Sequence, residues 1–240
     1  MWAGTATQVV FREAVLTAAI KSKVDRKRTQ YTSLKSSELE KVPGSNIKVA
    51  IDAAAPAGKF LSAAKTALTE KRKEAQGRKT AAKTASPETD VDSMDKDILA
   101  TLEIRISGYR SVETEKKLWT NYFSGYYNRT ADQRADLKDP HGEAAVKLTV
   151  KFIAPKKAPP GFSHHTEGVS IDFYQKRKIG KKEAWAKNST TNGTKPGQMK
   201  WWYNTWFYSW LHENAKTYGF KELASEAWHY DYVGVTPDTE

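Results

Sequence analysis

Three short runs of alternating residues limit the sheet that this chain can form. They are TLEIRI at residues 101–106, VSIDFY at 169–174 and WHYDYV at 228–233. Each run has the length and the β-branched or aromatic content of a strand, and none is long enough to be stable alone. Helical and polar segments separate the runs. We therefore predict an α+β fold, with a small and mostly antiparallel sheet flanked by helices.

The spacing of apolar residues also predicts several helices. Phe60, Leu61 and Leu68 lie on one face of the clearest of them. The predicted helices cover residues 5–28, 57–76, 112–128 and 199–217. Segment 145–153 fits either a helix end or a strand. Pro56 predicts a break, residues 77–97 and 130–143 are predicted to be polar connections, and a basic loop is predicted to follow residue 174 and to include residues 188–198.

Positive charge is concentrated near the start of the chain. The net charge is +11, and residues 1–85 carry 17 Lys or Arg against 7 Asp or Glu. Such a region can bind an anionic wall polymer, nucleic acid or an anionic lipid. The plain alternative is a solvated, Lys-rich helical surface. Because no recognisable nucleic-acid-reading motif accompanies the charge, nucleic acid is not the expected partner.

Two absences narrow the kind of protein that this chain can be. No apolar run reaches the length of a membrane span, so a transmembrane segment is not expected. Residues 1–23 lack a basic start before an apolar run, and Arg12 and Glu13 interrupt the apolar stretch, so a secretory signal is not expected either. If the substrate lies outside the cytoplasm, we expect another export route, such as an injection apparatus, or release by lysis.

Histidines and carboxylates are the ligands that this chain can offer to a metal ion, because it contains no cysteine. A catalytic zinc ion needs three such ligands and one open position for water. His165, Asp172 and His229 can supply them, and Glu226 can take a proton from the bound water. Gly168 permits a tight turn between His165 and Asp172. Triples of this kind also arise by chance, so these residues alone leave the assignment open.

Four short elements carry further information through their order and spacing. They are Ser107-Gly108-Tyr109-Arg110-Ser111, Ser163-x-His165-x-x-Gly168-x-Ser170-x-Asp172, Trp210-Leu211-x-x-Asn214-Ala215-x-x-Tyr218-Gly219-Phe220 and Glu226-x-Trp228-His229. In this order they resemble signatures of the VanY-type D-alanyl-D-alanine carboxypeptidases, zinc enzymes related to vancomycin-resistance dipeptidases and phage endolysin peptidases. Ser170 stands where that family commonly has alanine. The resemblance covers roughly residues 57–235, which predicts a zinc peptidase domain at 57–240 after a basic N-terminal extension at 1–56.

The resemblance implies a metal site at the sheet. His165, Asp172 and His229 would hold one Zn²⁺ ion per chain. Glu226 would be the base that activates water and later protonates the leaving amine, with Glu167 as a weaker rival. The neighbouring His164 is expected to be exposed or to lie outside the ligand set, because adjacent residues usually point apart.

The resemblance also implies residues that contact the substrate. Arg110 would hold the scissile carbonyl or stabilise the developing oxyanion, and the alternative is a structural ion-pair partner. Ser163, Tyr109 and Trp228 would shape or line the substrate site. His141 and His212 are not expected to be ligands.

These expectations define the predicted function and its competitors. We predict a zinc metallopeptidase that hydrolyses peptidoglycan stem peptides at the bacterial cell wall, as a D,D-carboxypeptidase or an endopeptidase, and as a candidate wall-degrading toxin or lysin. The basic N-terminal region would tether it to an anionic wall polymer or to a secretion apparatus. The main alternative is an inactive peptidase fold that binds wall peptide or glycan. The sequence does not specify which bond is cut.

Overall fold

The computed structural model describes residues 4–85, 92–186 and 198–234, which fall into two compact units. One unit combines residues 1–35 with 110–167, and the other combines residues 36–109 with 168–240. Among the described helices, none is both long and apolar enough to cross a membrane. The predicted division at residues 56 and 57 stays a prediction, and one helix runs through that position.

The second unit is built on an antiparallel five-stranded sheet. Its strands are β3 (Thr101–Ser107), β4 (Ser170–Ile179), β7 (Glu226–Tyr232) and β6 (Phe220–Leu223) in that order, and β5 (Lys182–Trp185) also pairs with β4. A separate hairpin joins β1 (Leu39–Lys41) to β2 (Lys48–Ala50) and follows the short 3-10 helix η1 (Ser36–Glu38). The three predicted strands and the α+β class are confirmed. β1, β2, β5 and β6 were missed because each has only three or four residues.

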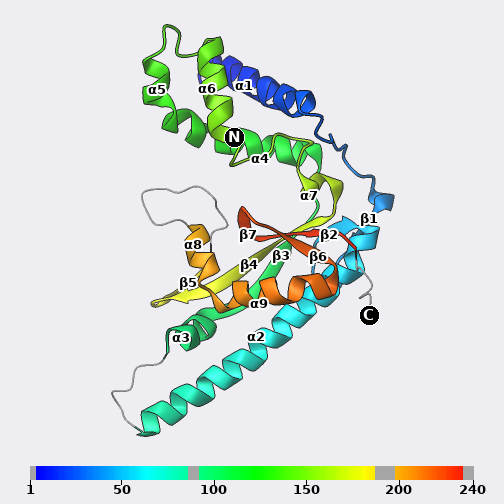
Figure 1. Ribbon diagram of the computed structural model, residues 1–240, viewed down its shortest axis with the longest axis vertical. Coiled ribbons are helices and arrows are strands. Elements are labelled where there is room, and N and C mark those ends of the chain that lie inside the picture. Colours follow the sequence, from blue (N-terminus) through cyan, green and yellow to red (C-terminus); the bar gives the residue numbers. More distant parts are fainter. Residues whose placement is uncertain (1–3, 86–91, 187–197, 235–240) are drawn as a thin grey trace. The chain divides into compact units, whose positions relative to one another are not determined.

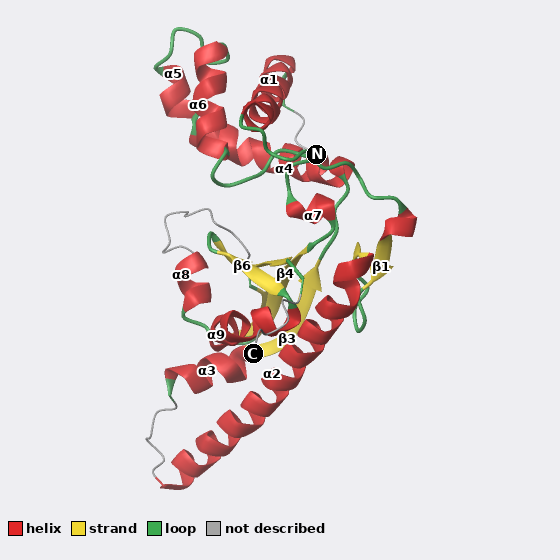
Figure 2. Ribbon diagram, turned by 45° about the vertical axis from the view of Figure 1, so that its right-hand side comes forward, coloured by secondary structure: helices red, strands yellow, loops and turns green. Residues whose placement is uncertain are grey.

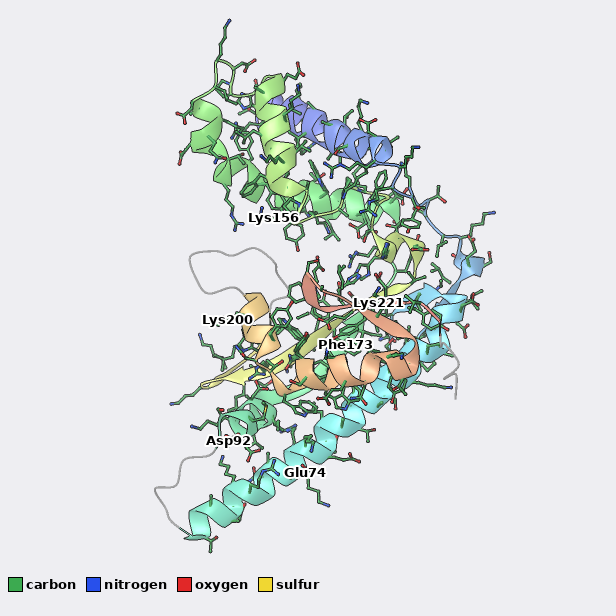
Figure 3. The ribbon with its side chains drawn as sticks, in the orientation of Figure 1. Glu74, Asp92, Lys156, Phe173, Lys200 and Lys221 are labelled. Atoms are coloured by element: carbon green, nitrogen blue, oxygen red, sulfur yellow. The ribbon has the colours of Figure 1, made fainter. Side chains whose placement is uncertain are left out.

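Helices of the second unit pack beside this sheet (Figures 1 and 2). They are α2 (Ile51–Ala85), α3 (Ser93–Ala100), α8 (Gln198–Tyr203), α9 (Trp206–Asn214) and the 3-10 helix η2 (Ala215–Tyr218). Phe60 of α2 is the centre of their core, with its ring centroid 5.0 Å from Phe173 and 5.1 Å from Tyr218. Phe173 is fully buried on β4 (Figure 3). This core fixes β4, the strand that carries Asp172.

The first unit is helical. It contains α1 (Ala6–Asp25), α4 (Val112–Arg129), α5 (Ala131–Ala135), α6 (Glu143–Ile153) and α7 (His164–Glu167). The apolar stripe of α1 packs on α4 and α6 through a separate core: Phe11, Val15, Leu16, Trp119, Phe123, Tyr126, Ala145 and Ile153. The predicted helix at 5–28 is therefore present, and its apolar face contacts residues more than 90 positions away.

Several predicted boundaries were wrong. The polar segment 77–97 is mostly helical where it is described, because α2 continues to Ala85 and α3 starts at Ser93. Arg78 ties the two helices together through paired hydrogen bonds to Asp95, the shorter 2.7 Å long. Pro56 does not break α2; it lies near the start of the helix, between the buried residues Ala54 and Ala57.

Other corrections concern the second half of the chain. Segment 145–153 belongs to helix α6, and a short helix, α5, lies in the predicted connection at 130–143. The predicted helix at 199–217 is interrupted because Thr205 is extended and caps α9, accepting a 3.1 Å hydrogen bond from the Tyr208 N–H. The basic loop predicted after residue 174 begins instead as the rest of β4, followed by β5. Of segment 188–198, only residue 198 is described.

Gly108 provides a test of how the hairpin packs on the end of β3. A Cβ atom at Gly108 would lie 2.6 Å from Ile47 Cγ2 and 2.7 Å from the Lys48 carbonyl oxygen. We expect Gly108→Ala to lower the free energy of unfolding by about 1–3 kcal/mol, the usual range for overpacking. Gly77→Ala is the matched control, because nothing lies within 4 Å of its Cβ position in helix α2. It should stabilise the protein by about 0.5–1 kcal/mol. Urea unfolding that showed the same change in both variants would contradict the close approach.

Candidate metal centre and active site

Asp172 and His229 face each other across two central strands. They are directly paired in the register of β4 and β7, and His229 Nδ1 lies 2.9 Å from Asp172 Oδ1. Asp172 is 7% exposed and His229 is 6% exposed. Ser107, at the end of β3, donates a 3.4 Å hydrogen bond to Asp172 Oδ2. Three neighbouring strands therefore set the position of this carboxylate.

A second carboxylate holds the other side of the His229 ring. Asp231 lies two residues further along β7, and on a strand such residues share a face. Its Oδ1 atom lies 2.9 Å from His229 Nε2 and also accepts a hydrogen bond from the Ser170 hydroxyl. Ser170 and Asp231 are themselves a cross-strand pair. The sequence reasoning missed Asp231, although a carboxylate two residues after a candidate ligand on a strand was an available signal.

The two carboxylates control the charge of His229. Burial alone would lower its pKa, but the hydrogen bonds to Asp172 and Asp231 outweigh burial and raise the pKa to about 10. Without a metal, both ring nitrogens can therefore carry protons that point at carboxylates. A metal ion at Nδ1 would have to replace one of them, so binding would release a proton.

His165 is positioned by the short helix α7 and its flanking residues. The Ser163 hydroxyl accepts a 3.3 Å hydrogen bond from the His165 N–H, and the His165 carbonyl accepts a 3.1 Å bond from the Arg110 N–H. His165 is 2% exposed, whereas the adjacent His164 is exposed and has its ring 6.1 Å from Tyr31, edge to face. His165 is thus buried and His164 is exposed, as the sequence predicts for His164.

The structure brings three of the predicted residues together as a possible metal site. One ligand atom from each of His165, Asp172 and His229 lies within 4.8 Å of the other two, and all three residues are buried. Within residues 4–85, 92–186 and 198–234, no other group of three or more histidines and carboxylates is close enough to hold a metal ion. Two imidazoles and one carboxylate are a set that can bind a metal and leave a coordination position open.

Glu226 lies beside this cluster without belonging to it. Its Oε2 atom is 4.0 Å from His229 Nδ1, the ring atom that also faces Asp172, and its side chain is 30% exposed. Residues three apart on a regular strand point to opposite faces. Here the pairing of β6 with β7 is irregular between Glu222 and Leu223, which is paired with Glu226. This irregularity allows Glu226 and His229 to approach each other.

Arg110 is part of a charge cluster. Its Nε atom donates a 2.5 Å hydrogen bond to Glu115 Oε1, and Lys157 Nζ lies 3.4 Å from Glu115 Oε2. Glu115 is 1% exposed. Burial alone would raise the pKa of its carboxyl, but Lys157 and Arg110 lower it. Arg110 therefore has the ion-pair partner that the structural alternative expected. Sequence reasoning missed Glu115 and Lys157, which no short motif marks.

The remaining predicted residues occupy varied positions. Tyr109 is half-buried, and its N–H donates a 2.9 Å hydrogen bond to the Lys48 carbonyl. Trp228 is 3% exposed and packs in the core, with its ring centroid 6.0 Å from that of Trp202. His212 is bonded to Glu222, and His141 to the Tyr127 hydroxyl. Neither of these two histidines lies in the metal cluster.

Comparison with known proteins identifies a family that this chain matches. Residues 91–235 match the model of the family described as VanY: D-alanyl-D-alanine carboxypeptidase. No curated protein sequence matches the chain.

Two solved structures are similar to the chain over most of its length. A mutant of the vancomycin-resistance D,D-pentapeptidase VanY, in complex with Zn(II), is 18% identical, with a TM-score of 0.43 and coverage of 86% of this chain and 82% of that one. VanYB in complex with D-alanine-D-alanine is 16% identical, with a TM-score of 0.43 and 86% of each chain covered. Because the family match spans more than half of its residues, the chain belongs to the VanY family of D-alanyl-D-alanine carboxypeptidases.

Proposed function

We propose that this chain is a zinc-dependent peptidase that hydrolyses the stem peptides of bacterial peptidoglycan. The observation that carries the proposal is the buried cluster of His165, Asp172 and His229 with Glu226 beside it. Family membership supports the substrate class. Because peptidoglycan lies outside the cytoplasm, the proposed place of action is the cell wall.

The donor set fits zinc. The described residues offer nitrogen from two histidines and oxygen from one aspartate, with no fourth ligand among them. That is the composition of a catalytic rather than a structural zinc site. A bound zinc ion would polarise the scissile carbonyl and make water acidic enough to lose a proton near neutral pH. His229 would bind through Nδ1 while Nε2 donates to Asp231, the arrangement that fixes ring orientation in many metal sites.

The chain's own residues would then move the protons. Glu226 would accept a proton from water as the water oxygen attacks the scissile carbonyl carbon. As the C–N bond breaks, the same carboxyl would give the proton to the leaving amine. Arg110, oriented by Glu115, would stabilise negative charge on the carbonyl oxygen. Ser163 would act indirectly, by holding the start of α7.

A digestion experiment tests the proposal directly. Purified peptidoglycan and synthetic stem pentapeptides would be incubated with the full chain, with and without zinc, and the products identified by mass spectrometry. We expect peptide-bond cleavage that a chelator abolishes and zinc restores. A folded, zinc-loaded protein that cleaves neither substrate would instead support the inactive binding module.

Asp231 gives a test of the metal site that does not depend on turnover. Asp231→Asn keeps the side-chain shape but removes the negative charge that His229 Nε2 and Ser170 contact. We expect zinc affinity to fall about 10- to 100-fold, the usual cost of losing a partner of a ligand histidine. Glu222→Gln is the matched control, because Glu222 lies on strand β6 of the same sheet and accepts a hydrogen bond from His212, outside the cluster. Equal zinc affinities in a chelator competition would show that Asp231 does not orient the ligand.

A further inference from the structure

Lys157 is held close to a buried carboxylate by the end of helix α6. Its backbone N–H donates a 3.1 Å hydrogen bond to the Ile153 carbonyl, so its position continues the last turn of that helix. Its side chain is 19% exposed and contacts Oε2 of Glu115. Arg110 contacts Oε1, the other oxygen of the same carboxylate. One buried negative charge is therefore flanked by two positive groups.

The ammonium group of Lys157 retains capacity for a further anion. Its distance of 3.4 Å from Glu115 Oε2 is longer than a normal N–H···O hydrogen bond, and that oxygen has no hydrogen-bond partner within the described residues. The half-exposed ring of Tyr122 also lies near Lys157, with its centroid 5.9 Å from Nζ. An ammonium has three donors on a flexible stem, so it can bond an incoming carboxylate and stay near Glu115.

This charge cluster lies beside a proposed metal ligand within the same unit. The Arg110 N–H bonds to the His165 carbonyl, and the Arg110 side chain bonds to Glu115. In a peptide cleaved at its last bond, the terminal carboxylate lies one residue, about 3.8 Å of chain, beyond the scissile carbonyl. A cation that recognises the terminus must therefore lie close to the metal ligands.

We propose that Lys157 binds the terminal carboxylate of the substrate and so makes this chain a carboxypeptidase rather than an endopeptidase. The inference rests on the proposed function, and it names the residue that selects the last peptide bond. The alternative is that Lys157 only neutralises Glu115. These two roles of Lys157 predict different results. Only a residue that binds the substrate carboxylate should make the enzyme distinguish a peptide with a free C-terminus from one with a blocked C-terminus.

The test compares two peptides that end in D-Ala-D-Ala, one with a free carboxylate and one with a C-terminal amide. For the zinc-loaded wild-type chain, we expect kcat/KM to favour the free acid by about 10- to 100-fold, as for a hydrogen bond to a charged group. In Lys157→Met, KM for the free acid should rise by a similar factor, and the preference should largely disappear. Wild-type protein that cleaves both peptides equally well would overturn the proposal.

Lys156→Met is the matched control. Lys156 is the preceding residue, but its ammonium donates a 2.7 Å hydrogen bond to the Phe152 carbonyl and lies over the Phe152 ring. This variant should keep the preference for the free acid. If Lys157→Met instead lowers kcat equally on both peptides, Lys157 acts only by supporting Glu115, and the proposal fails.

Binding measurements separate this inference from the proposed function. Calorimetric titration of the zinc-loaded wild type and Lys157→Met with both peptides reports the preference even without turnover. Selective binding of the free acid that Lys157→Met abolishes, without hydrolysis, would support Lys157 and contradict the peptidase. Hydrolysis with equal binding of acid and amide would contradict Lys157 alone.

Discussion

Glu226→Gln is expected to abolish peptide hydrolysis while the protein keeps its zinc. The substitution preserves the size of the side chain but removes the carboxylate that would take the proton from water. Loss of a positioned general base typically costs a factor of about 10² to 10⁴ in rate. Zinc should remain, because Glu226 lies outside the cluster of His165, Asp172 and His229. Turnover of a synthetic stem peptide and the zinc content of the same sample are the two measurements.

Glu167→Gln is the control for this variant. Glu167 follows His165 by two residues and is the weaker rival for the role of base, so it tests whether another carboxylate can take the proton. We expect Glu167→Gln to keep most of the activity. Hydrolysis that survives Glu226→Gln but is lost in Glu167→Gln would move the base to α7. Loss of zinc from Glu226→Gln would make Glu226 a metal-site residue instead.

The parts of the fold that sequence could predict depend on local patterns. Alternation along residues 101–106, 169–174 and 228–233 identified three strands, and those strands carry or border most of the site. The candidate site residues could be named from sequence because they lie in four short motifs, at residues 107–111, 163–172, 210–220 and 226–229. The end of α2 was missed because the helix persists through a polar stretch, where Arg78 contacts Asp95 across 17 positions.

The parts that sequence could not predict depend on register and on distant contacts. Ser170 contacts Asp231 only because β4 pairs with β7 in a register that places these two residues opposite each other. Glu115 and Lys157 meet across 42 positions of sequence, from a helix and a proline-rich segment. No short motif predicts this contact between Glu115 and Lys157, because the contact depends on the packing of α4 and α6 on a shared core.

His165→Ala is expected to remove zinc binding at concentrations that saturate the wild type. It deletes one of the three proposed ligands, so the loss should exceed the roughly 10- to 100-fold effect of losing an outer partner such as Asp231. Hydrolysis should be lost with the metal. The neighbouring variant His164→Ala is the control, because His164 is exposed and lies outside the cluster. Its zinc affinity should match that of the wild type.

Thermal unfolding gives this pair of variants a readout that is independent of activity. A ligand at 100 times its Kd stabilises the folded state by about 2.7 kcal/mol, so zinc should raise the Tm of the wild type and of His164→Ala. It should not raise the Tm of His165→Ala. Because the two histidines are adjacent, a general loss of helix α7 would affect both variants, whereas loss of a ligand affects only one. Zinc stabilisation that disappeared in His164→Ala but persisted in His165→Ala would reverse the assignment of the ligand.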